Sequence, residues 1–135
     1  MMQITISKLQ KYIAQKDFNP DLKHEYFYKL SEEVGELSRA MRKNVTFTNG
    51  GEFKGTVEEE VYDVLYYVLA IANSYDIDVN RWIYEKEKLN DDKYNSKMAE
   101  TLLHLDTSLG DLESLSTSSI AFWENDIDDE VWNDV

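Results

Sequence analysis

Two short acidic motifs contain the residues of this chain best suited to chemistry. The first is Glu32-Glu33-Val34-Gly35-Glu36 and the second is Glu60-Val61-Tyr62-Asp63. Each motif places two carboxylates three residues apart beside a row of aliphatic side chains. Carboxylates held this close repel one another unless a cation lies between them, so the pattern predicts a site for a divalent metal ion.

The two motifs have the same phase relative to the apolar rows of their expected helices. At about 100° per residue, Glu33 lies just beside its row and Glu36 lies about 60° further round. Glu60 and Asp63 have the same relation to the second row. Two antiparallel helices packed through these rows would bring four carboxylates to one edge, where they could bind one or two Mg²⁺ or Mn²⁺ ions. Glu32 points further outward.

Other interpretations of the acidic motifs remain open. Acids spaced by three or four residues are common on solvated helix faces, and Glu58-Glu59 fits that description. A diiron bundle is a weaker alternative because it requires Glu-x-x-His pairs, whereas His24 and His104 lie in no such motif.

Helical periodicity and helix-end signals predict an all-α protein with four helices packed as a bundle. A capping box, Thr56-Val57-Glu58-Glu59, begins the third helix. The glycine-rich segment Asn44–Gly55 is expected to be a loop or a short ribbon. The four helices are expected over Thr5 to about Lys16, Asn19-Pro20 to about Lys43, Thr56 to about Tyr75, and Asp78 to about Tyr94.

Apolar rows are expected to form the contacts between the second and third helices. Their members are Tyr26, Leu30, Val34, Leu37 and Met41 on the second helix, and Val57, Val61, Val64, Val68, Ile71 and Tyr75 on the third.

Charge is unevenly distributed between a domain at residues 1–95 and an acidic C-terminal extension at residues 96–135. The formal net charge is −13, and the extension contains ten acids against a single lysine. Such acidity disfavours nucleic acid and anionic membrane as partners. The absence of cysteine, of a signal peptide and of a long apolar run favours a cytoplasmic protein. The extension is expected either to be solvated or to dock through Phe122, Trp123, Ile127, Val131 and Trp132.

A third motif combines cations with an amide. Lys86, Asn90 and Lys93 lie on one face at helical spacing and could hold phosphate oxygens beside a metal site. The alternative is an ordinary solvated helix end.

Taken together, the three motifs resemble the MazG-like family of all-α nucleoside triphosphate pyrophosphatases. The family pattern Glu-Glu-x-x-Glu, a spacer and then Glu-x-x-Asp corresponds to Glu32-Glu33-x-x-Glu36 and Glu60-x-x-Asp63. The later element Lys-x-x-x-Asn-x-x-Lys/Arg-Tyr corresponds to the segment from Lys86 to Tyr94. The resemblance covers residues 5–95 and implies a four-helix MazG-like bundle.

This resemblance implies Mg²⁺-dependent hydrolysis of a (deoxy)nucleoside triphosphate to the monophosphate and pyrophosphate, which would clear unwanted nucleotides. It implies Mg²⁺, with Mn²⁺ as a substitute, and assembly as a homodimer or homotetramer. The implied metal ligands are Glu33, Glu36, Glu60 and Asp63, with Glu32 positioning the attacking water. The implied contacts to substrate are Lys86, Asn90, Lys93, Tyr94, Phe18 and His24.

Recognition of the base is the least defined part of this hypothesis. Phe18 and His24 lie where the family offers contacts to the base, with Phe27 and Tyr28 nearby. Phe18, Phe27 and Tyr28 are equally typical of ordinary core or helix-packing aromatic residues. The similarity leans towards members that act on deoxypyrimidine triphosphates. A different class of function, a catalytically silent helical module that binds a partner protein through its acidic aromatic tail, is the alternative.

Overall fold

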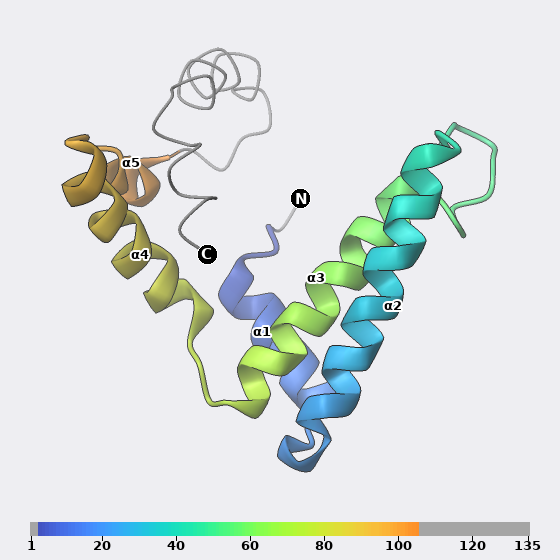
Figure 1. Ribbon diagram of the computed structural model, residues 1–135, viewed down its shortest axis with the longest axis horizontal. Coiled ribbons are helices and arrows are strands. Elements are labelled where there is room, and N and C mark those ends of the chain that lie inside the picture. Colours follow the sequence, from blue (N-terminus) through green and yellow to red (C-terminus); the bar gives the residue numbers. More distant parts are fainter. Residues whose placement is uncertain (1–2, 106–135) are drawn as a thin grey trace. The chain divides into compact units, whose positions relative to one another are not determined.

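A computed structural model describes residues 3–105 of the 135-residue chain. All the regular secondary structure of residues 3–105 is helical, which confirms the predicted all-α class (Figure 1). None of the helices in residues 3–105 is both long enough and apolar enough to cross a bilayer. The apolar residues of the extension, from Phe122 to Trp132, lie outside the described residues. The elements formed by residues 3–105 are α1 (Ile6–Lys16), the 3₁₀ turn η1 (Pro20–Leu22), α2 (Lys23–Arg42), α3 (Val57–Ser74), α4 (Val79–Tyr94) and α5 (Ala99–His104).

The chain divides into two compact units, Met1–Trp82 and Ile83–Val135. The division falls within α4, near its start. The boundary predicted near residue 95 stays a prediction.

Polar caps begin the helices of the first unit much as expected. The Thr5 and Thr56 hydroxyls each accept a hydrogen bond from the backbone N–H three residues later, at 3.2 Å. Asn19 also acts as a cap, since its side chain accepts from Asp21 N at 3.0 Å. It begins the turn η1 rather than an α-helix, and α2 starts only at Lys23.

The antiparallel hairpin of α2 and α3 dominates the first unit, and α1 packs against α3 (Figure 1). The core lies where the three helices meet, around Ile13, Tyr26, Leu69 and Ala70. Tyr26 also joins the chain segments, because its hydroxyl donates to Asp17 Oδ1 at 3.0 Å and accepts from Asn19 N at 3.1 Å. This core lies at the end of the hairpin opposite the α2–α3 loop.

The predicted apolar rows are wrong in part. Val34 on α2 is 49% exposed and Val61 on α3 is 52% exposed, whereas Glu60 is buried. The helices therefore meet through faces rotated from the expected rows, and carboxylates occupy part of the contact. The cause is that α3 packs against α1 as well as α2 and has apolar residues around most of its circumference, so periodicity alone does not select the face that meets α2.

Positive backbone angles terminate the helices and shape the connections. Asn44 follows α2 with φ +52°, and Asp76 follows α3 with φ +56°. The segment between α2 and α3 is the expected loop, and residues 3–105 contain no ribbon. One backbone hydrogen bond, from Val57 N to Val45 O at 2.8 Å, fastens the start of this loop to the start of α3.

Candidate metal centre

Three of the predicted acids converge between α2 and α3. Glu33 from α2 and Glu60 and Asp63 from α3 each offer a carboxylate oxygen, and these oxygens lie within 4.8 Å of one another. Antiparallel packing explains the convergence, because it places the middle of α2 opposite the first two turns of α3. The cluster supplies only oxygen ligands, which suits Mg²⁺ or Mn²⁺.

Glu60 is the most deeply placed of the three acids, with 5% of its surface exposed. Its Oε2 is buried without a hydrogen-bond partner. Burial, and after it the neighbouring carboxyl of Glu33, raise the pKa of Glu60 to about 7. A buried oxygen without a partner is costly, so this atom fits a ligand position that a cation would satisfy.

The other two carboxyls show the same excess of negative charge. Burial raises the pKa of Glu33, a hydrogen bond with Glu60 opposes that rise, and the charge of Asp63 adds to it. Burial and then the charge of Glu59 raise the pKa of Asp63, whereas the charge of Lys54 lowers it. Without a cation the cluster therefore favours protonated carboxyls, and a divalent cation would reverse that preference.

Glu36 and Glu32 lie outside this group of three. Glu36 is exposed, one turn along α2, and its charge raises the pKa of Glu33. Glu32 is exposed as well, and its Oε2 lies 3.0 Å from Lys29 Nζ. Both residues add negative charge near the cluster, but neither is among the three residues whose carboxylate oxygens converge.

Two neighbours of the cluster were missed by the sequence analysis. Lys29 lies one turn before Glu33 on α2 and interacts electrostatically with Glu33 and Tyr67. Burial raises the pKa of Tyr67, Lys29 lowers it and Glu33 raises it, which places this phenol beside the same carboxylates. The four-residue spacing from Lys29 to Glu33 was the available signal for the lysine.

The predicted phosphate-binding residues of α4 belong to the second unit. Asn90 Nδ2 donates to Glu87 Oε1 at 3.3 Å, and Lys93 Nζ lies 5.7 Å from the centre of the Tyr94 ring. Lys86 is exposed. The carboxylates lie in the first unit and these residues in the second, so a role for Lys86, Asn90, Lys93 and Tyr94 at the metal centre stays a prediction.

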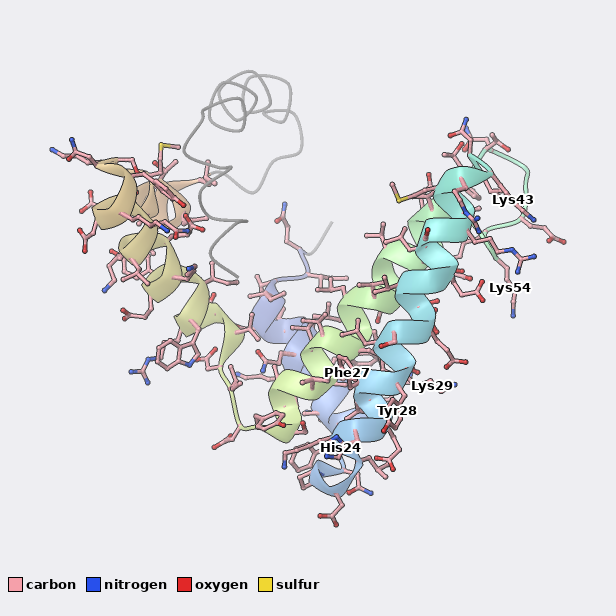
Figure 2. The ribbon with its side chains drawn as sticks, in the orientation of Figure 1. His24, Phe27, Tyr28, Lys29, Lys43 and Lys54 are labelled. Carbon is pink, nitrogen blue, oxygen red and sulfur yellow. The ribbon has the colours of Figure 1, made fainter. Side chains whose placement is uncertain are left out.

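The residues expected to contact the base lie away from the carboxylates. His24 is nine residues before Glu33 on α2, which corresponds to about 13 Å of helical rise, and Figure 2 shows it at the far end of the hairpin from the loop. Phe18 lines a cavity of about 510 Å³ together with Gln10 and Asn73, near the end of α3. The structure therefore brings neither residue to the acidic cluster of this chain.

Phe18, Phe27 and Tyr28 are not core side chains of the first unit, and their alternative role in packing between helices stays a prediction. Phe18 is 55% exposed, Phe27 is 55% exposed and Tyr28 is 65% exposed. Phe27 and Tyr28 contact each other in a tilted arrangement with ring centres 6.5 Å apart.

Comparisons with known proteins agree on one family. The family model for the MazG nucleotide pyrophosphohydrolase domain matches residues 23–93, which span α2, α3 and nearly all of α4. The crystal structure of Ntag-iMazG from Vibrio DAT 722 is 43% identical with a TM-score of 0.62, covering 68% of this chain and 99% of that chain. The Ctag-iMazG structure from the same source is 42% identical with a TM-score of 0.60, covering 65% and 99%. A search among curated proteins found no match. The chain belongs to the MazG nucleotide pyrophosphohydrolase family.

Proposed function

We propose that this protein hydrolyses (deoxy)nucleoside triphosphates to the monophosphate and pyrophosphate in the presence of Mg²⁺, and so clears unwanted nucleotides. The observation that carries the proposal is the convergence of Glu33, Glu60 and Asp63, whose oxygens lie within 4.8 Å of one another. The buried Glu60 Oε2, which has no protein partner, supports a cation at this place. Membership of the MazG family supports the reaction type.

A divalent cation at this cluster would supply positive charge that offsets the charge of the phosphates and would act as a Lewis acid. Glu33, Glu60 and Asp63 would hold it, with Glu36 reaching in from the next turn of α2. Glu32 would orient the attacking water on the outer side. Manganese is a substitute because it accepts the same oxygen ligands.

Contacts to the rest of the substrate are proposed from the motif in α4. Lys86, Asn90 and Lys93 present two cations and an amide to phosphate or sugar oxygens, and Tyr94 completes the set. Two parts of the proposal have the least support. One is a preference for deoxypyrimidine triphosphates. The other is contact with the base by Phe18 and His24, because neither residue lies near the carboxylates of its own chain. A cytoplasmic location, as expected from the cysteine-free composition, and the absence of nucleic-acid partners also stay predictions.

We further propose that the protein assembles as a homodimer or homotetramer through one side of the hairpin. Val34 comes one residue after Glu33, and Val61 comes one residue after Glu60. Because the two helices are antiparallel and meet near Glu33 and Glu60, the two valines lie on one side of the hairpin and Glu36 and Asp63 lie on the other. Exposed apolar rows with a seven-residue repeat on two neighbouring helices are typical of helix–helix contacts. The members of the two rows are Phe27, Val34 and Met41 on α2, and Val61 and Val68 on α3 with Tyr75 at its C-terminal cap.

The test is to incubate the protein with each deoxynucleoside triphosphate and Mg²⁺ and to measure monophosphate and pyrophosphate. Asp63→Asn is expected to lower turnover by more than about 100-fold, since loss of groups that merely support a metal ligand already costs about 10–100-fold. Glu25→Gln, which removes an exposed acid from the first turn of α2, is the matched control and should leave turnover unchanged. If no triphosphate yields a monophosphate, the catalytically silent module that binds a partner protein becomes the better description.

A further inference from the structure

Gln10 is a buried polar residue of α1 that holds the turn between α3 and α4. Only 9% of its surface is exposed. Its side-chain amide donates to the carbonyl oxygen of Ile77 and accepts a hydrogen bond from the N–H of Val79 at 3.2 Å. Near the end of α3, Asn73 Nδ2 donates to the backbone carbonyl of Gln10 at 3.0 Å. One residue of α1 thus connects the end of α3 to the start of α4, 63 to 69 residues further along the chain.

The contact with Val79 is a helix cap supplied by a distant part of the chain. Val79 is the first residue of α4, so its N–H has no acceptor within that helix. Such a donor is commonly satisfied by the residue just before the helix. Here the acceptor belongs to α1, and the same amide group also binds the carbonyl of Ile77, two residues earlier. Because hydrogen bonds are directional, two of them from one planar group fix both the place and the direction of the chain as it enters α4.

Packing constrains this turn less than the hydrogen bonds do. Residues 75–78 are exposed, and a cavity of about 510 Å³ lies beside Asn73 and Ile77. The side chain of Val79 packs against the core of the first unit, but apolar packing is non-directional. The structure describes every residue of α4, and none of them is buried. The direction of the first turn of α4 therefore depends on Gln10.

The direction of α4 matters because this helix carries the residues proposed to bind the phosphates, Lys86, Asn90 and Lys93. We propose that Gln10 is a positioning residue, which supports binding of the triphosphate by holding the start of the helix that contacts it. This inference rests on the proposed function. It assigns a role in substrate affinity to a residue of α1 that is itself expected to touch neither the metal nor the substrate.

A positioning role and a purely structural role differ in their effects on kinetics. Contacts made equally in the bound substrate and in the transition state lower KM without changing kcat. The carboxylates of the metal centre lie on α2 and α3, so the affinity for metal should not depend on Gln10. A purely structural clamp would instead lower the melting temperature and leave the KM of the folded protein unchanged.

The experiment compares Gln10→Met with the matched control Gln15→Met in the full chain. Methionine has nearly the length of glutamine but can form neither hydrogen bond, and Gln15 is an exposed glutamine of the same helix. Hydrogen exchange at the Val79 amide reports whether the clamp is lost. KM and kcat are measured with the preferred triphosphate. Isothermal titration gives the affinities for Mn²⁺ alone and for inorganic tripolyphosphate in the presence of Mg²⁺.

Gln10→Met is expected to speed hydrogen exchange at Val79 and to raise KM about tenfold, as the loss of one to two buried hydrogen bonds implies. The affinity for tripolyphosphate should fall by a similar factor. The value of kcat and the affinity for Mn²⁺ should change by less than about twofold, since neither depends on the phosphate contacts of α4. Gln15→Met should change none of these values.

Three results overturn the proposal. One is unchanged exchange at Val79, and another is faster exchange with unchanged KM and unchanged affinity for tripolyphosphate. The third is a loss of affinity for Mn²⁺ that accompanies the rise in KM. If Gln10→Met does not fold, Gln10→Glu is measured in its place. It keeps an acceptor for Val79 but loses the donor to Ile77, so KM should rise about threefold, and an unchanged KM overturns the proposal.

The proposed function can fail on its own. Binding of tripolyphosphate that depends on Gln10, in a protein that hydrolyses no nucleotide, would reject the enzymatic activity and keep the positioning role. Hydrolysis with a KM that is insensitive to Gln10→Met would reject the positioning role and keep the activity. A protein that neither hydrolyses nucleotides nor binds tripolyphosphate would overturn both.

Discussion

Replacing Glu60 by glutamine should stabilise the metal-free protein at high pH and remove its response to metal. The pKa of this buried carboxyl is raised from 4.5 to about 7. The folded chain therefore holds a proton that the unfolded chain has already lost across this window, so the free energy of unfolding falls as pH rises from about 4.5 to about 7. Glutamine has nearly the same shape, cannot ionise, and can donate its amide hydrogens to the carboxylate of Glu33.

The size of the effect follows from the shift in pKa. One unit corresponds to about 1.4 kcal/mol, so the full shift of Glu60 corresponds to about 3 kcal/mol, of which about 2 kcal/mol is expected after the proton is shared with Glu33. For a chain of this length, that difference raises the melting temperature by about 8 °C. The gain should be present at about pH 8 and nearly absent at about pH 4, where the Glu60 carboxyl of the unchanged protein is protonated in both the folded and the unfolded chain.

Thermal unfolding followed by circular dichroism provides the measurement, in EDTA and in millimolar Mg²⁺ at each pH. The unchanged protein should gain stability from Mg²⁺ mainly at about pH 8, whereas Glu60→Gln should gain little. Glu25→Gln controls for removal of an exposed negative charge. A variant that melts no higher than the unchanged protein in EDTA at about pH 8, or that keeps the full response to Mg²⁺, would refute the assignment of Glu60 as a destabilised ligand.

Three further outcomes are expected. Thr56→Ala removes the cap that accepts from Glu59 N and should lower the free energy of unfolding by about 1–2 kcal/mol in urea titrations, whereas Thr56→Ser should keep most of it; equal losses in both would contradict the capping role. Val34→Glu combined with Val68→Glu should convert the oligomer to monomer in light scattering, and unchanged mass would exclude this side of the hairpin as the interface. Asp91→Ala should increase hydrogen exchange at the first amides of α5, because its carboxylate accepts from the backbone N–H groups of Met98 and Ala99 at 2.9 and 2.8 Å, and unaltered exchange would show that the cap is dispensable.

The helices and their ends were predictable because they depend on neighbours in the chain. Thr5 and Thr56 act as caps wherever their helices pack, since the accepting hydroxyl and the donating amide are three residues apart. Asn44 and Asp76 follow α2 and α3 with positive backbone angles, which are local properties. Asp91 was not predicted as a cap, because the amides that it binds belong to the following helix, seven and eight residues later.

The sequence by itself determined which acids are available, how they are spaced and that their helices would be antiparallel neighbours. Only the tertiary structure decided which acids meet: Glu33 and Glu60 lie in the contact between α2 and α3, while Glu36 stays exposed. Spacing fixes the angle between residues on one helix, but the rotation of that helix against its neighbour depends on the whole interface. For α3 that interface includes α1 as well as α2, so the buried face and the partnerless oxygen of Glu60 arise only in the packed fold.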